Sequence, residues 1–167
     1  RLADNINARL LPVYILDKNV SERDNFEQFE QAFTQRNDSF ILRDEASGSK
    51  FYFRRENAPN KLDLFLLEGD SSGAKAEKNL REFLDEFKTV DFEKYMEDEL
   101  LTKELGIKSF PAILINNRIK VSGVVSADTV KGLFCKANKL DECAKNLSKS
   151  SKNKRWRNPS NRNTALN

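Results

Sequence analysis

Hydrophobic positions along the chain form two patterns: short apolar runs, typical of strands, and spacings of three and four residues, typical of helices. The apolar runs predict strands at 12–16 (PVYIL), 39–42 (SFIL), 51–53, 62–67 (LDLFLL) and 110–115 (FPAILI). Three sets of apolar residues predict helical faces: Phe26, Phe29 and Phe33; Leu80, Phe83, Leu84 and Phe87; and Phe92, Tyr95, Met96, Leu100, Leu101 and Leu105. The mixture predicts an α/β protein.

The C-terminal third of the chain contains residues typical of turns and helix caps. Asn116-Asn117 predicts a tight hairpin turn into a strand at 119–121. Gly123 ends that strand, and Ser126 is a good N-cap for a last helix, because its hydroxyl can accept a hydrogen bond from the first turn. From about Ser148 onward the chain is polar, basic and aperiodic, which predicts a disordered tail.

The organisation suggests three regions. Residues 12–33 and 62–87 both read as a strand, a polar loop and a Phe-rich helix. We therefore expect residues 1–61 to be an N-terminal β-α-β extension or a degenerate repeat. Residues 62–147 form the main α/β domain, and residues 148–167 form the basic tail.

Composition narrows the chemistry. The net charge is only +3, but no acidic residue follows Glu142, so the basic character lies in the tail. The chain has no histidine, which excludes Ser–His–Asp and Cys–His catalysis within it. Two cysteines make a zinc site improbable, so we expect no cofactor and no metal. No apolar run approaches the roughly 18 residues of a membrane span. A chain that begins at Arg1 is expected to be a processed or excised piece.

The order of predicted elements from Leu62 to Cys143 resembles that of the thioredoxin-like fold. Strand, loop and two helices precede the segment Gly106 to Asn117 (GIKSFPAILINN), which a hairpin, Gly123 and a closing helix follow. In thioredoxins a helix end leads in this way to a cis-proline that opens a strand, and Pro111 takes that place here. The resemblance covers about half the chain and implies a central mixed sheet flanked by helices.

A narrower resemblance is to disulfide-exchange domains of the thioredoxin and DsbA type, in which the first strand runs into a Cys-x-x-Cys turn. Here the turn is Asp70-Ser71-Ser72-Gly73, and the reactive cysteine would fall at Asp70 or Ser71. A helix N-terminus favours a thiolate at that place, but neither Asp nor Ser forms a disulfide, and a Ser without a base is a poor nucleophile. The chain is therefore expected to be redox-inactive at this turn, with Ser71 or Ser72 capping the helix.

The resemblance also implies a function. In active relatives the groove between this turn and the cis-proline loop aligns an extended substrate, so an inactive copy can keep the binding and lose the exchange. We expect a non-catalytic module that binds a protein or peptide partner through Asp70, Ser71, Ser72, Gly73, Phe110 and Pro111. Two alternatives stay open: a thiol–disulfide oxidoreductase or redox-linked chaperone that uses Cys135 and Cys143, and a structural domain of a larger assembly.

Two further features bear on location and partners. Cys135 and Cys143, near the last helix, can be a reactive pair or a structural disulfide, and the family resembled favours the structural disulfide. We expect that bond to contribute roughly 2–3 kcal/mol on the chain-entropy model. Such a bond predicts an extracytoplasmic protein, in the periplasm, the medium or the secretory lumen. The sequence Arg155-Trp156-Arg157 suits contact with an acidic partner, nucleic acid or a membrane surface, but a solvated terminus is the favoured interpretation, and nucleic acid is not favoured.

Overall fold

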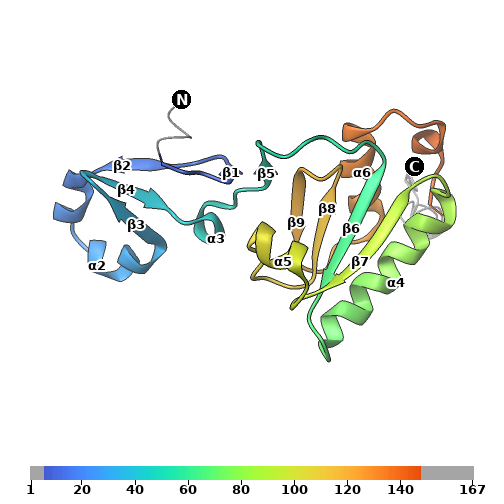
Figure 1. Ribbon diagram of the computed structural model, residues 1–167, viewed down its shortest axis with the longest axis horizontal. Coiled ribbons are helices and arrows are strands. Elements are labelled where there is room, and N and C mark those ends of the chain that lie inside the picture. Colours follow the sequence, from blue (N-terminus) through green and yellow to red (C-terminus); the bar gives the residue numbers. More distant parts are fainter. Residues whose placement is uncertain (1–5, 148–167) are drawn as a thin grey trace, which may run out of the picture.

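The computed structural model describes residues 6–147, so the predicted basic tail at 148–167 lies outside the described residues (Figure 1). The strands are β1 (Leu10–Leu11), β2 (Ile15–Asp17), β3 (Phe33–Arg36), β4 (Ser39–Leu42), β5 (Phe51–Tyr52), β6 (Lys61–Leu66), β7 (Asp91–Met96), β8 (Ala112–Ile115) and β9 (Ile119–Ser122). The α-helices are α2 (Phe26–Phe29), α3 (Asp44–Ser47), α4 (Ser71–Glu86), α5 (Leu100–Leu105) and α6 (Ala127–Ala137). The 3-10 turns are η1 (Lys18–Glu22), η2 (Glu30–Ala32) and η3 (Asp141–Ala144).

A six-stranded mixed sheet with the order β1-β5-β9-β8-β6-β7 forms the centre of the molecule. Strand β6 is parallel to β7 and antiparallel to β8, and β8 and β9 form an antiparallel hairpin. The connection β6-α4-β7-α5-β8-β9-α6, with β6 and β8 adjacent at the centre, is the thioredoxin-like arrangement expected from the sequence. The predicted fold class is confirmed.

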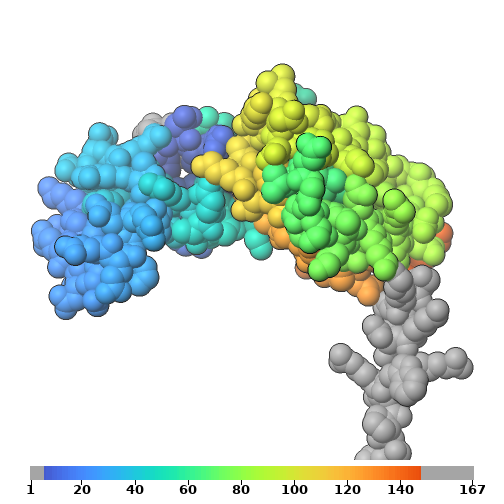
Figure 2. Space-filling view, turned by 90° about the horizontal axis from the view of Figure 1, so that it is seen from below, coloured from blue at the N-terminus to red at the C-terminus, as the bar shows by residue number. Residues whose placement is uncertain are grey.

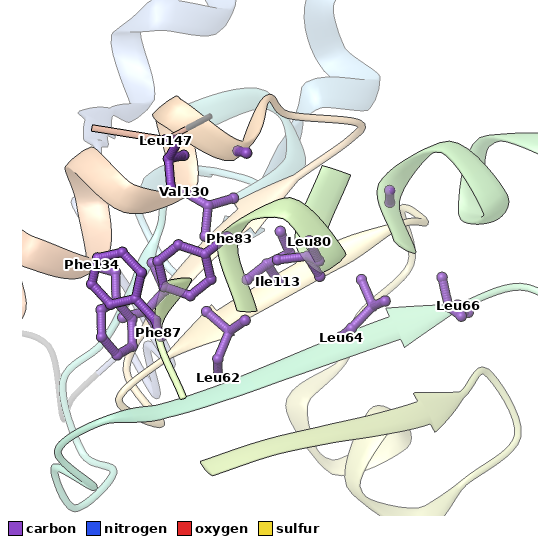
Figure 3. Packing of buried hydrophobic residues seen from close by; sticks show 13 residues of the cluster. Leu62, Leu64, Leu66, Leu80, Phe83, Phe87, Ile113, Val130, Phe134 and Leu147 are labelled. Atoms are coloured by element: carbon purple, nitrogen blue, oxygen red, sulfur yellow. The ribbon is translucent and has the colours of Figure 1, made fainter. Parts of the chain in front are cut away.

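Helices cover both faces of this sheet because successive side chains of β6 alternate between the two sides. Leu62 and Leu64 pack in one core cluster with Phe83 of α4 and Phe134 of α6. Phe65 packs in a second cluster that includes residues of α5 and β8. Figure 3 shows the first cluster closely, with the rings of Phe83, Phe87 and Phe134 beside Leu62 at the start of β6.

The N-terminal region adds strands to the main sheet at the edge opposite β7. Strands β1 and β5 extend the sheet beyond β9, and β2, β4 and β3 form a separate three-stranded antiparallel sheet (Figure 1). Of the predicted strand at 12–16 only Ile15 and Leu16 are in a strand, β2, and the first three residues are not. Pro12 follows β1 and has no N–H for a ladder.

The predicted helical face of Phe26, Phe29 and Phe33 is wrong beyond its first turn. Helix α2 ends at Phe29, whose side chain is 59% exposed, and Phe33 begins β3. The Phe26 and Phe33 rings instead pack edge-on against Phe40 of β4, with centroids 5.0 and 6.2 Å away. Pairing of β3 with β4 therefore outweighs the helical spacing.

The predicted helix that carried Phe92, Tyr95 and Met96 is also wrong in its first half. Those residues lie in β7, and only Leu100–Leu105 is helical, as α5. The same letters alternate as a strand, and β7 pairs with all six residues of β6. Without β7, one edge of the buried strand β6 would carry unpaired backbone groups, so tertiary pairing decides the structure.

The hairpin turn between β8 and β9 is confirmed at Asn116-Asn117. Both residues have positive φ, 51° and 61°, and the Arg118 N–H closes the turn on the Ile115 carbonyl at 3.0 Å. The buried Asn116 amide bonds to Asn138 at the end of α6, Nδ2 to Oδ1, at 2.8 Å. This amide pair fixes the hairpin against the last helix.

Candidate functional site

At one end of the main sheet β6 and β9 end and β8 begins, and beside each of these three strands lies an apolar side chain that is not fully buried. Phe65 of β6 is opposite Ala112 of β8, which is opposite Ser122 of β9. Leu67, Phe110 and Val124 each lie two residues beyond those partners. Because adjacent strands are about 4.8 Å apart, these three residues line the same end of the sheet. We call Leu67, Phe110 and Val124 the apolar edge.

The exposed fractions at the apolar edge are high for such residues. Leu67 is 38% and Val124 41% exposed, while Phe110 is half-buried and packs against the second core cluster. Figure 2 shows the molecule from this end, where the green segment that follows β6 lies beside the yellow segment that leads to β8. Neither Leu67 nor Val124 was predicted as a site residue from the sequence.

The loop that leads into β8 places backbone groups beside these side chains. The Phe110–Pro111 peptide bond is cis, and the buried Pro111 carbonyl accepts a hydrogen bond from the Gly123 N–H at 2.7 Å. Within residues 6–147, the N–H and C=O groups of Lys108, Ser109 and Phe110 make no backbone hydrogen bond. A short stretch of main chain is therefore free to pair with an added strand.

The turn after β6 is held by its own hydrogen bonds. Asp70, and not Ser71 or Ser72, is the N-cap of α4: its carboxylate accepts hydrogen bonds from the Ser72 N–H at 3.0 Å and from the Ser72 hydroxyl. The hydroxyl bond, followed by the N–H bond, lowers the pKa of Asp70. Asp70 therefore serves as a charged cap at the positive end of the helix.

Gly73 completes the turn by close packing. It is buried, and a Cβ placed there would lie 3.2 Å from the Leu66 side chain. Of the predicted binding residues at this turn, only Ser71 is exposed. The strand register brings the turn and the cis-proline to the same edge of the sheet, since β6 ends beside the start of β8.

Charge is distributed unevenly around the apolar edge. On the β6 and β7 side, Glu68, Glu97 and Asp98 are exposed, and none of them forms an ion pair within the described part of the chain. On the β9 side, Lys108 pairs with Glu45 of the N-terminal region at 3.5 Å, a contact between exposed side chains. The acidic side therefore has three exposed carboxylates without an ion-pair partner among the described residues.

A cavity of about 430 Å³ adjoins the β9 side of the edge. It is lined by α3, the loop that precedes the cis-proline, β9 and α6, and it contains Asp44 and Lys120. Burial raises the pKa of Asp44 and lowers the pKa of Lys120, in each case against the attraction of the opposite charge. The cavity holds charges of both signs and does not select one class of ion.

A buried carboxyl group lies near the middle of β6. Asp63 is 1% exposed; its Oδ1 has no hydrogen-bond partner among the described residues and lies 3.7 Å from the Lys61 ammonium. Burial, reinforced by the nearby Glu93 carboxylate, raises the pKa of Asp63 to about 6 despite the Lys61 charge. A lone acidic residue in the apolar run LDLFLL is the sequence signal for this group.

The predicted disulfide between Cys135 and Cys143 is present. Both cysteines pack against the main core cluster, and Asn138 between them accepts a hydrogen bond from the Asn60 N–H at 3.0 Å. Asn60 directly precedes β6, so the disulfide is at the opposite end of the sheet from Leu67. Six strand residues separate the two ends, which corresponds to about 20 Å.

Residues 6–147 contain no group of three or more His, Cys, Asp or Glu side chains that could hold a metal ion, and no helix in this range is long and apolar enough to cross a membrane.

Comparison with known proteins gives structural similarity alone. No family model matches the chain, and no curated protein matches it. Eight solved chains match, among them a thioredoxin from Malassezia sympodialis (Mala s 13) with 16% identity and a TM-score of 0.38. That match covers 52% of this chain and 83% of the thioredoxin. The fold assignment rests on the strand order and connections of the chain itself.

Proposed function

We propose that this chain is a non-catalytic thioredoxin-like module that binds an extended segment of a protein partner at the apolar edge. The observation that supports this most directly is the coincidence of exposed apolar side chains with free main chain. Leu67 and Val124 flank Phe110, whose own N–H and C=O make no backbone hydrogen bond within residues 6–147. An added strand gains main-chain hydrogen bonds there and places alternate side chains on the apolar residues.

The sequence at the helix turn supports binding without exchange. Asp70-Ser71-Ser72-Gly73 offers no thiol, and the Asp70 carboxylate is already engaged by Ser72. The Cys135–Cys143 pair is bonded and about 20 Å from the apolar edge by strand length. In this proposal the disulfide holds the segment after α6 on the core, and it takes no part in binding. The disulfide also agrees with a location outside the cytoplasm.

The test is selection of ligands from a phage-displayed library of random 12-residue peptides on the immobilised full chain. Selected peptides should bind wild-type protein and lose at least about tenfold in affinity, roughly 1.4 kcal/mol, with Leu67→Asp or Val124→Asp. Both residues are substantially exposed, so the folded state should tolerate these changes. Phe29→Asp is the matched control, because Phe29 is 59% exposed and lies in α2, outside the main sheet.

Selected peptides that bind equally well to Leu67→Asp and Val124→Asp would contradict the proposed site. The oxidoreductase alternative makes a different prediction: binding, or mixed-disulfide formation with a cysteine-containing peptide, would require Cys135 or Cys143. A double Cys135→Ser, Cys143→Ser variant that retains peptide affinity excludes that alternative.

A further inference from the structure

We propose that the chain's own C-terminal segment docks on the apolar edge, with Trp156 on the apolar side chains and Arg155 and Arg157 against the acidic side. The inference rests on the proposed function, because the segment would occupy the surface that a partner uses. It adds an intramolecular competitor, so a partner binds by displacing the segment.

Charge complementarity is the first argument. Residues 62–105, which include the acidic side of the apolar edge, contain thirteen acidic and six basic residues. Residues 148–167 contain six basic residues and no acidic one. Glu68, Glu97 and Asp98 are exposed beside Leu67 and have no cation within the described part of the chain. A basic segment of the same molecule is at high effective concentration for such a surface.

The apolar part of the surface fits the one aromatic residue of that segment. Leu67 and Val124 are exposed and Phe110 is half-buried, while Trp156 is the only tryptophan of the chain and stands between two arginines. An indole buries a large apolar area for few rotatable bonds, and arginine side chains on both sides reach carboxylates at the border of the same patch.

The described chain ends beside the first turn of α6. After the disulfide the chain turns back along α6, so that the Lys131 ammonium donates to the Lys145 carbonyl. The Leu147 side chain is buried beside Val130, as Figure 3 shows. Val130 is in the first turn of α6, which starts three residues after Val124 of the apolar edge. The described chain therefore ends about 5 Å along α6 from the helix start.

The remaining distance is within reach. Trp156 is nine positions after Leu147, and an extended chain of nine residues spans up to about 30 Å. The three strands that carry the apolar edge are together only about 10 Å wide. Docking therefore needs no change in the described part of the structure.

The experiment is Trp156 fluorescence of the full chain, compared with a synthetic peptide of residues 148–167. Docking covers at least one face of the indole, so the acrylamide quenching constant should be about twofold lower in the full chain than in the peptide, and the emission should shift to the blue. The protection should not depend on protein concentration. It should weaken in about 1 M salt, where the Debye length is about 3 Å.

Variants locate the contact. Val124→Asp and the double Glu97→Lys, Asp98→Lys variant should each restore the quenching of the free peptide, while Phe29→Asp should leave the protection unchanged. Quenching of the full chain equal to that of the peptide at low salt overturns the inference. Protection that survives the edge variants, or that grows with protein concentration, also overturns it.

The two proposals fail separately. If phage-selected peptides bind the edge while Trp156 is as accessible as in the free peptide, the inference fails and the proposed function stands. If the edge variants release Trp156 but no peptide binds, even to a Trp156→Ala chain, the proposed function fails and with it the displacement by a partner, while the docking of the segment stands.

Discussion

Replacement of Asp63 by Asn should make the protein more stable, and the gain should grow with pH. Asp63 is 1% exposed near the middle of β6, and its Oδ1 has no hydrogen-bond partner among the described residues. Burial raises its pKa to about 6, against an ordinary value of 3.8. The folded state therefore binds a proton more tightly than the unfolded state, and stability falls as pH rises through this window.

The magnitude follows from the difference between the two pKa values. Each pKa unit corresponds to about 1.4 kcal/mol, so ionised Asp63 costs the folded state about 3 kcal/mol above pH 7. At pH 4.5 the cost is only about 1 kcal/mol, and below pH 3 it is close to zero. The stability difference between Asp63→Asn and wild type should thus increase by about 2 kcal/mol between pH 4.5 and 7.5, then remain constant.

The assay is urea unfolding of the full chain at closely spaced pH values, with constant m values as the sign that the unfolded state is unchanged. Comparing the two proteins at each pH cancels the contributions of groups that do not interact with Asp63. The cost of packing the new amide is independent of pH and does not affect the slope. Asp85→Asn is the control, because Asp85 has a side chain 78% exposed on α4. A difference between Asp63→Asn and wild type that does not change with pH would refute the assignment of a buried, ionisable Asp63.

Other substitutions test the structural roles of single groups by the same unfolding assay. Asn138→Ala removes the amide that bonds to the neighbouring asparagine of the hairpin turn, and the groups left unpaired should cost about 2–4 kcal/mol; a loss below 0.5 kcal/mol would contradict a buried amide pair. The double Cys135→Ser, Cys143→Ser variant should lose about 2.5 kcal/mol, the chain entropy of an eight-residue closure; an unchanged midpoint would show that the disulfide is not a structural support. Phe134→Ala should cost about 3–5 kcal/mol, because the ring is fully buried and packs edge-on against two other rings, whereas Phe29→Ala should change stability by less than about 0.5 kcal/mol; equal effects would contradict the placement of Phe29 at the surface.

The elements that the sequence predicts well are those whose local signals and tertiary contacts agree. The run at 110–115, the turn at Asn116-Asn117 and the cap at Ser126 each combine strong local preferences with burial of the same residues. The order of elements was then sufficient to indicate the thioredoxin-like fold.

The errors occur where an apolar spacing fits two structures. Phe92, Tyr95 and Met96 satisfy a helical spacing, but the edge of β6 needs a parallel partner strand, and β7 provides it. Phe33 also continues a helical face in the sequence, yet it pairs with Leu42 of β4. Such residues are assigned by contacts distant in sequence, which a local pattern does not contain.

The candidate site was predicted only in part for a related reason. Phe110 and the Asp70 turn lie in recognisable motifs, whereas Leu67 and Val124 look like ordinary residues at the ends of apolar runs. They become one surface only because β6, β8 and β9 are adjacent and in register. The serines of the turn were expected to cap α4, but Asp70 does so, since its carboxylate reaches the Ser72 N–H.

The most direct test of the proposed binding mode is amide NMR of the isotope-labelled full chain during titration with a phage-selected peptide. The largest shift changes should fall on Leu67, Ser109, Phe110 and Val124, and the Phe110 amide should become protected from hydrogen exchange as it pairs with the peptide backbone. Changes centred on Cys135 and Cys143, or on the three-stranded sheet, with the apolar edge unaffected, would contradict the account.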